Sequence, residues 1–134
     1  MTSRVIYKGN LRTECEHLQS KTKFITDAPL DNEGKGEAFS PTDTVATAVA
    51  SCMFTIMGIK ARDMEVDIEG TTAEVTKTMA SNPRRISGIK VDITVKGDVL
   101  SDKERAILEN AAKTCPVLQS IHPDIEKDIT FTYA

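Results

Sequence analysis

Two cysteines in contrasting positions are the residues of this chain with the most distinctive chemistry. Cys52 lies inside a charge-free run from Thr44 to Ile59, whereas Cys115 stands directly before Pro116 at an expected helix start. A thiol among apolar helix residues is usually inert packing. A thiol at a helix start is close to free backbone N–H groups and the positive end of the helix dipole, which favour the thiolate. If the fold brings the two cysteines together, the pair is predicted to be a thiol–disulfide redox centre.

The remaining candidate groups predict less chemistry. Cys15 lies in a strand-like stretch between two glutamates, and we interpret it as structural. The two histidines, His17 and His122, are far apart and no Cys-x-x-Cys pattern occurs, so neither a metal site nor a cofactor is expected. His122 follows Cys115 by seven residues. Its place at a helix end favours a surface histidine over the base of a cysteine hydrolase.

Length and composition are those of one ordinary globular domain spanning residues 1–134. The chain is 28% charged and 40% apolar, as in typical soluble domains of one core. A net charge of −3 and an aromatic content of 4% give no reason to expect nucleic acid or a membrane as partner. Three cysteines after an N-terminus without a secretion signal favour a reducing, cytoplasmic location. The charge-free run is short for a bilayer span, so we predict a buried helix.

The elements that must position the cysteines follow an α+β order. The long helix that carries Cys52 is expected to begin at Ser40 and Pro41, where Asp43 completes a capping box. Its apolar residues cover every face, so other elements or a partner subunit must enclose it. A second helix is expected over 101–114, and a short helical turn after Cys115. Strands that pair antiparallel are expected over 4–8, 11–17, 21–27, 72–79, 89–96 and 129–133.

Several motifs together resemble the OsmC/Ohr family, which comprises osmotically inducible protein C and the organic hydroperoxide resistance proteins. The segment 79–86 is similar to the OsmC-like branch in particular. The resemblance covers essentially the whole chain and keeps the order of the elements. The motifs that carry it are Ala38-Phe39-Ser40-Pro41-Thr42-Asp43, Ala48-Val49-Ala50-Ser51-Cys52-Met53, Thr114-Cys115-Pro116-Val117 and His122-Pro123-Asp124-Ile125.

The resemblance implies a fold, an assembly and an activity. It implies an intertwined homodimer in which antiparallel sheets wrap two long central helices, and a thiol-dependent reduction of organic hydroperoxides in oxidative-stress defence. Cys52 matches the cysteine that attacks the peroxide, and Cys115 matches the one that resolves the sulfenic acid to a disulfide. An external dithiol, such as a lipoylated or thioredoxin-like protein, must then reduce that disulfide. An apolar pocket from Val49, Met53, Phe54 and Ile56 would favour bulky organic peroxides.

Charged partners of the thiolate are also implied by the resemblance. Arg12 is the best match to the arginine that supports the reactive thiolate in the family. Hydroperoxide resistance proteins pair that arginine with a glutamate ten residues before the reactive cysteine, where this chain has Thr42. Asp43 is adjacent and acidic, but at about 100° per residue it lies opposite Cys52 around the helix axis. Asp43 therefore either joins the site through Arg12 or another loop, or serves only as the capping carboxylate.

Two alternatives to the peroxidase remain open at this point. One is a non-catalytic dimeric stress protein that binds a hydrophobic ligand at its interface. The other is a redox sensor that uses the same cysteine pair without turnover. Loss of the family's glutamate favours these alternatives, whereas an intact pair with a Cys-Pro helix start favours the enzyme.

Overall fold

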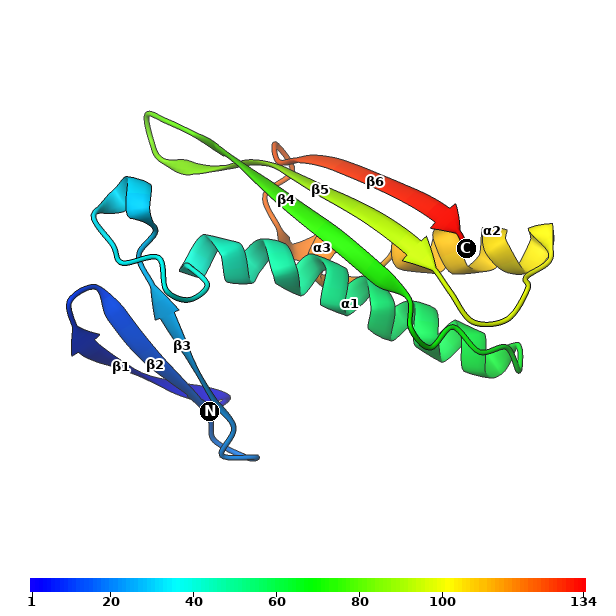
Figure 1. Cartoon of the computed structure of the whole chain (residues 1–134), viewed down its shortest axis with the longest axis horizontal. Coiled ribbons are helices and arrows are strands. Elements are labelled where there is room, and N and C mark those ends of the chain that lie inside the picture. The colour runs from blue at the N-terminus through cyan, green and yellow to red at the C-terminus, as the bar shows by residue number, and fades with distance from the viewer. The chain divides into compact units, whose positions relative to one another are not determined.

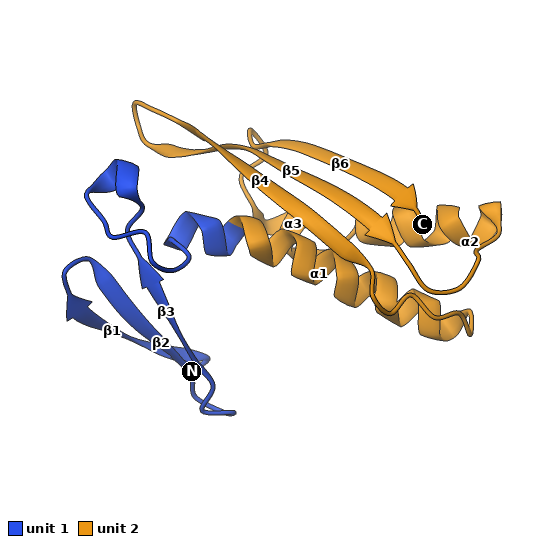
Figure 2. Ribbon diagram, in the orientation of Figure 1, with its two compact units in different colours: residues 1–45 blue, residues 46–134 orange.

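The computed structural model describes all residues from 1 to 134 and consists of two compact units, residues 1–45 and residues 46–134 (Figure 2). The long helix begins in the first unit and continues through the second. The expected order of strands and helices is confirmed, with small shifts at the element ends. In chain order the elements are β1 (Ser3–Gly9), β2 (Arg12–His17), β3 (Lys23–Asp27), the 3-10 helix η1 (Leu30–Asn32), α1 (Pro41–Asp63), β4 (Thr72–Ala80), β5 (Arg85–Val95), α2 (Asp102–Ala112), α3 (Pro116–Ser120) and β6 (Glu126–Tyr133).

The first unit is built on an antiparallel meander of β1, β2 and β3. Gly9 adopts a positive φ of 86° in the first turn, a conformation that glycine enters at little cost. Apolar side chains lie on both faces of this small sheet. Val5 and Phe24 flank Cys15 on one face, and Ile25 is on the other. All three of these large side chains are exposed within one chain, so the sheet lacks a core of its own.

The capping box expected at the start of α1 is confirmed. The Asp43 carboxylate accepts a hydrogen bond from the Ser40 N–H at 2.9 Å, and the Ser40 Oγ accepts one from the Asp43 N–H at 3.0 Å. These bonds satisfy backbone donors that a helix start would otherwise leave free. The start of the helix that carries Cys52 is therefore determined locally.

The second unit contains a sheet in the order β4-β5-β6. β4 and β5 form an antiparallel hairpin, but β6 runs parallel to β5. The expectation of antiparallel sheets is therefore wrong for this last pair. Between β5 and β6 the chain forms α2 and α3 on one side of the sheet (Figure 1). A crossover of this length returns the chain to the same end of the sheet, which parallel pairing requires.

The core of the second unit lies between this sheet and its helices. Every second residue of β5 from Ile89 to Val95 is buried, as the alternating pattern predicted. From α1 the core takes Ala46, Val49, Ala50, Met53, Met57 and Ala61. The remaining buried positions are Leu100, Leu108, Ala112, Cys115 and Leu118. Burial of these apolar side chains is the main force that fixes the cysteine-bearing elements.

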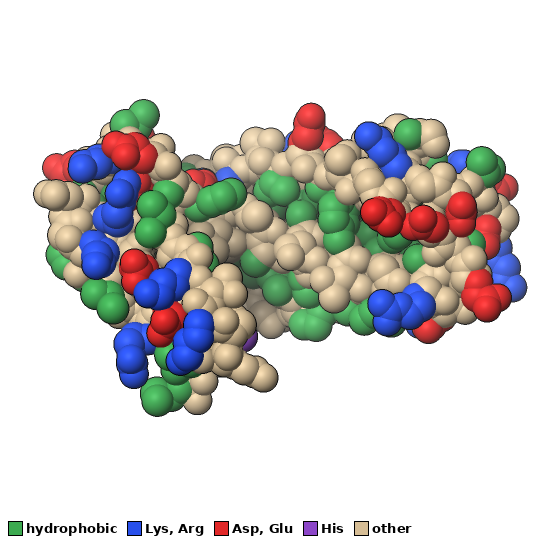
Figure 3. Space-filling model, turned by 60° about the horizontal axis from the view of Figure 1, so that its bottom comes forward, with side chains coloured by type: hydrophobic (Ala, Val, Ile, Leu, Met, Phe, Trp, Pro, Cys, Tyr) green, Lys and Arg blue, Asp and Glu red, His purple; other side chains and the backbone are tan.

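One chain buries only one face of α1. On the opposite side Val45 is 40% exposed and Ile59 is 50% exposed. Hydrophobic side chains are correspondingly visible over α1 in Figure 3. The expectation that the helix is enclosed on every face is therefore not met within a single chain. By length and composition alone α1 could also cross a membrane, but its buried face packs into the core described above.

A polar cluster joins α2 to the C-terminal end of β6. The Tyr133 hydroxyl donates a hydrogen bond of 2.6 Å to Glu109, and the Arg105 guanidinium lies 4.2 Å from the centre of the Tyr133 ring. Burial and the neighbouring Glu109 carboxylate raise the pKa of Tyr133. The phenol is therefore a hydrogen-bond donor that stabilises the parallel strand.

Candidate redox site

Cys52 is held near the middle of α1 at the boundary between the buried and open sides of the helix. Met53, the next residue, is fully buried in the core, whereas Cys52 itself is partly exposed. Ala48 and Ile56 lie one helical turn before and after Cys52 and share its face. The thiol therefore combines an apolar surrounding with access from outside the chain.

Cys115 is the N-cap residue of α3 and has 0% exposed surface. Its sulfur accepts a hydrogen bond from the Leu118 N–H at 3.4 Å. Burial raises the pKa of the Cys115 thiol, and hydrogen bonds from the backbone of Leu118 and Val117 offset this only in part. The prediction that the helix start favours a Cys115 thiolate is therefore wrong. Burial destabilises the thiolate more than the hydrogen bonds at the helix N-terminus stabilise it.

The fold brings the two cysteines of α1 and α3 together. The Cys52 side chain lies close enough to Cys115 to raise the pKa of the Cys115 thiol further. Both sulfurs are free thiols, and both pack in the same core. The two cysteines, which are distant in the chain, are thus neighbours in the fold, and their action as a redox pair stays a prediction. The arrangement places a partly exposed thiol beside a buried one.

The predicted apolar pocket is not formed by the four residues expected to line it. Val49 and Met53 are at most 1% exposed and belong to the core. Phe54 instead lines a shallow hollow between α1 and β4, of about 520 Å³, together with Ala50, Ala73 and Val75 and the hydroxyl residues Thr47, Ser51 and Thr55. Phe54 lies two residues from Cys52, on a different side of the helix. The four residues do not line one pocket because successive residues of a helix are about 100° apart around its axis and therefore lie on different faces.

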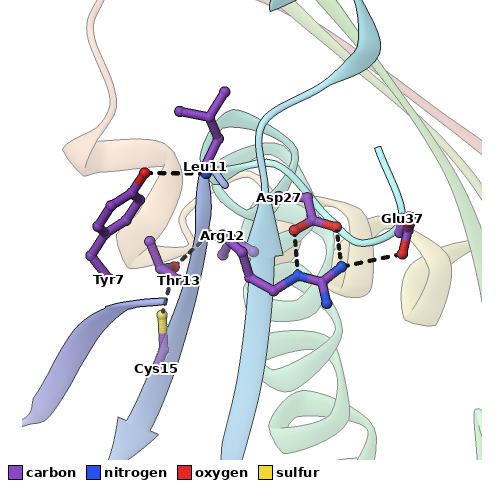
Figure 4. A network of polar contacts seen from close by, with 8 residues as sticks. Tyr7, Leu11, Arg12, Thr13, Cys15, Asp27 and Glu37 are labelled. Carbon is purple, nitrogen blue, oxygen red and sulfur yellow. Dashed lines mark hydrogen bonds and ion pairs between the residues drawn. The ribbon is translucent and has the colours of Figure 1, made fainter. Parts of the chain in front are cut away.

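Arg12 forms a bidentate ion pair with Asp27 in the first unit (Figure 4). Its Nε and Nη2 donate to the two carboxylate oxygens at 2.7 and 2.8 Å, and Nη2 also contacts Glu37 at 3.3 Å. Asp27 is 1% exposed. The hydrogen bonds from Arg12 hold the pKa of the Asp27 carboxyl below its usual range, and those bonds likewise raise the pKa of Arg12.

Asp27 and Glu37 were not found by sequence reasoning, although one signal was present. Arg12 and Asp27 are directly opposite each other on β2 and β3. A hairpin folded about the turn expected at Gln19-Ser20 places these two residues in register. Arg12 thus pairs with the cross-strand residue Asp27. This ion pair does not require an acidic residue at position 42, where the hydroperoxide resistance proteins have their glutamate.

Asp43 caps the start of α1, which is one of the two roles expected for it from the sequence. Its carboxylate and backbone make the reciprocal bonds with Ser40 described above. His122 is an exposed residue whose Nδ1 accepts from the Asp124 N–H at 3.0 Å, as expected for a surface histidine. Cys15 lies within β2 and pairs with Val5 and Phe24. No group of three or more metal-ligating side chains occurs in the structure.

Comparisons with known proteins agree with the fold. A family model described as OsmC-like protein matches residues 34–130. A solved structure from Psychrobacter arcticus, provisionally named as an osmotic stress induced and detoxification response protein, is 60% identical. It covers 98% of this chain and 95% of its own, with a TM-score of 0.94. No curated protein matches the sequence.

More distant structures share the fold. An organic hydroperoxide resistance protein from Legionella pneumophila is 18% identical, with a TM-score of 0.75 over 98% of this chain and 97% of its own. Another, from Elizabethkingia anophelis, is 14% identical, with a TM-score of 0.76 over 100% of this chain and 97% of its own. At this level of identity the likeness concerns the fold alone.

Proposed function

The chain belongs to the OsmC-like protein family, and on that premise we propose that it reduces organic hydroperoxides with the thiols of Cys52 and Cys115. The observation that carries the proposal is the meeting of a partly exposed thiol on α1 with a buried thiol at the start of α3. Relatives of the same fold include proteins named for organic hydroperoxide resistance.

The first step requires a thiolate that a peroxide can reach. Cys52 is the partly exposed member of the pair, and Ala48 and Ile56 on its face suit the organic part of a hydroperoxide. The Cys52 thiolate attacks the O–O bond of ROOH, and with one proton the products are the Cys52 sulfenic acid and the alcohol ROH. Cys115 keeps its proton at this stage because its pKa is raised by burial.

The second step uses the buried thiol. The Cys115 sulfur displaces the hydroxyl of the sulfenic acid, so that a Cys52–Cys115 disulfide forms and the thiol proton leaves with the hydroxyl as water. A dithiol reductant then restores both thiols by exchange and is itself oxidised to a disulfide. A lipoylated or thioredoxin-like protein fits this requirement. Such reductants are found in the cytoplasm, which is the location we propose.

Arg12 and Asp43 complete the proposed set of site residues. We propose that the Arg12 guanidinium supports the thiolate, as the family resemblance implies. Its pairing with Asp27 keeps the side chain charged and ordered. For Asp43 the capping bonds support a positioning role, because they set the start of the helix on which Cys52 lies.

We also propose that the protein is a homodimer. The apolar face of α1 that contains Val45 and Ile59, and the exposed apolar side chains of the first unit such as Val5 and Phe24, have no partner in one chain. Exposed apolar surface of this extent favours association. A second copy of the chain would cover it.

Steady-state turnover tests the function. We expect dithiol-dependent consumption of cumene hydroperoxide, faster than that of hydrogen peroxide, which Cys52→Ser lowers by at least about 100-fold. In Cys115→Ser the first attack survives, but without resolution Cys52 is over-oxidised to the sulfinic acid, which peptide mass spectrometry detects. Cys15→Ser is the matched control and should keep full activity. Equal turnover by wild type and Cys52→Ser would contradict the proposed function.

The hollow between α1 and β4 favours a second candidate function, the binding of a hydrophobic ligand without turnover. Its apolar floor and hydroxyl rim would suit a small amphipathic molecule. In that case neither cysteine variant would change binding, and no peroxide would be consumed.

A further inference from the structure

The two thiols of the redox pair differ sharply in how they can be reached. Cys115 has 0% exposed surface within a single chain, so association with a second chain can only keep it covered. Leu108 and Leu118, also buried, belong to the same core cluster. Cys52 is partly exposed. Any molecule that reaches the pair from solvent therefore meets the Cys52 sulfur first.

We propose that the reducing dithiol attacks the Cys52 sulfur of the Cys52–Cys115 disulfide and expels Cys115 as the leaving thiol. This inference rests on the proposed function, because it concerns the disulfide which that reaction forms. Thiol–disulfide exchange needs the attacking sulfur in line with the bond that breaks. Cys52 lies at the surface of its own chain, on the α1 face that also carries Val45 and Ile59 and that the proposed dimer uses, whereas an attack on Cys115 would have to pass through the core of that chain.

The exchange balances in two steps. The first thiolate of the dithiol forms a mixed disulfide with Cys52, the Cys52–Cys115 bond breaks, and Cys115 takes up a proton. The second thiol of the reductant then attacks the reductant's first sulfur, which is bonded to Cys52 in the mixed disulfide. That step releases Cys52 as a thiolate and leaves the reductant as a disulfide. Two electrons move from the dithiol to the protein, and no other reactant is required.

Burial raises the pKa of Cys115 and so slows its departure, and the choice of the attacked sulfur therefore rests on access. As the bond breaks, negative charge develops on a sulfur that already accepts a hydrogen bond from the Leu118 N–H at the start of α3. Because burial raises the pKa of the Cys115 thiol, the released thiolate is then protonated rather than kept as an anion.

One consequence is that peroxide and reductant use the same opening at Cys52. The two substrates must then bind in turn to the reduced and the oxidised protein, which predicts ping-pong kinetics. Bulk added on the face of α1 beside Cys52, at Ala48, should impede both half-reactions.

The attack can be mapped with a monothiol probe, which cannot complete the second step. In a Cys15→Ser background the disulfide is formed with diamide instead of a peroxide, so that the experiment does not depend on peroxidase activity. The oxidised protein is mixed with N-acetylcysteine, quenched with acid, unfolded and labelled with N-ethylmaleimide. Peptide mapping should find the N-acetylcysteine adduct on Cys52 and the maleimide on Cys115, in at least about tenfold excess over the reverse arrangement.

Three results would overturn the inference: the adduct on Cys115, adducts on both cysteines in similar amounts, or no Cys52–Cys115 disulfide after diamide. Single-cysteine variants supply a second readout. The disulfide of N-acetylcysteine with Cys52, in Cys15→Ser/Cys115→Ser, should be reduced by dithiothreitol at least about tenfold faster than that with Cys115, in Cys15→Ser/Cys52→Ser. A Cys52-selective adduct in a protein that consumes no peroxide would contradict the proposed function while leaving the site of attack established.

Discussion

The thiol of Cys115, at the start of α3, is fully buried, and its neighbour Cys52 on α1 is the partly exposed member of the pair. The interaction between them contributes to the raised pKa of Cys115. This asymmetry divides the proposed chemistry, because the accessible thiol can meet a substrate while the buried one stays protonated until a sulfenic acid forms beside it.

The first prediction concerns the reactivity of Cys115. In the folded Cys15→Ser/Cys52→Ser variant, iodoacetamide should alkylate Cys115 at least about tenfold more slowly than in urea, since a buried thiol of raised pKa has little thiolate. The rate should still rise with pH above the ordinary thiol pKa of about 8.5. Alkylation at the same rate in the folded and unfolded protein would show that Cys115 is not buried in solution.

The same raised pKa predicts how stability depends on alkaline pH. As the pH rises above about 8.5, the unfolded chain loses the Cys115 proton before the folded chain does. The free energy of unfolding should therefore fall between that pH and the folded pKa of Cys115. Urea denaturation should show a smaller alkaline fall in Cys115→Ser than in wild type, with Cys15→Ser behaving as wild type.

A third prediction concerns the ion pair of Arg12 with Asp27 at acid pH. The pKa of Asp27 is lowered by its bonds to Arg12, so the stability from this pair is complete above the ordinary aspartate value of about 3.9 and is lost as the pH falls through the folded value. Asp27→Asn should lower the free energy of unfolding at pH 7 and weaken its fall below pH 4. The exposed Asp128→Asn on β6 is the matched control, and identical acid profiles for wild type and Asp27→Asn would contradict the prediction.

The open face of α1 predicts a dimer that one charge can break. Ile59 is half exposed in one chain, and Ile59→Glu would bury an unpaired carboxylate in the interface at a cost of several kcal/mol. That cost corresponds to roughly 100-fold weaker association or more. Sedimentation should find a dimeric wild type, a dissociating Ile59→Glu variant, and an unchanged Lys103→Glu variant on α2. A monomeric wild type would refute the dimer.

Some of this structure was predictable because it is encoded locally. Ser40 and Asp43 at the start of α1, and Ser101 and Glu104 at the start of α2, form the capping boxes that their spacing indicated. The alternating residues of β5 gave its buried face correctly. The family resemblance identified Cys52 and Cys115 as a pair, and the structure places them near each other, whereas their joint role in catalysis stays a prediction.

Other features depend on tertiary context that a linear pattern does not contain. The parallel pairing of β6 follows from the path of α2 and α3 across the sheet. The raised pKa of Cys115 follows from burial in a core assembled from several elements, which outweighs the helix start on which the sequence argument relied. The Asp27 partner of Arg12 requires the register of the hairpin.

A single turnover without reductant shows whether Cys52 and Cys115 react together with a peroxide. Reduced protein in the Cys15→Ser background is mixed with one equivalent of cumene hydroperoxide, the remaining thiols are blocked with N-ethylmaleimide, and non-reducing peptide mapping follows. We expect one Cys52–Cys115 disulfide per chain, within the same chain, with one equivalent of alcohol released. Unmodified thiols with the peroxide left intact, or oxidation that leaves Cys115 free, would contradict it.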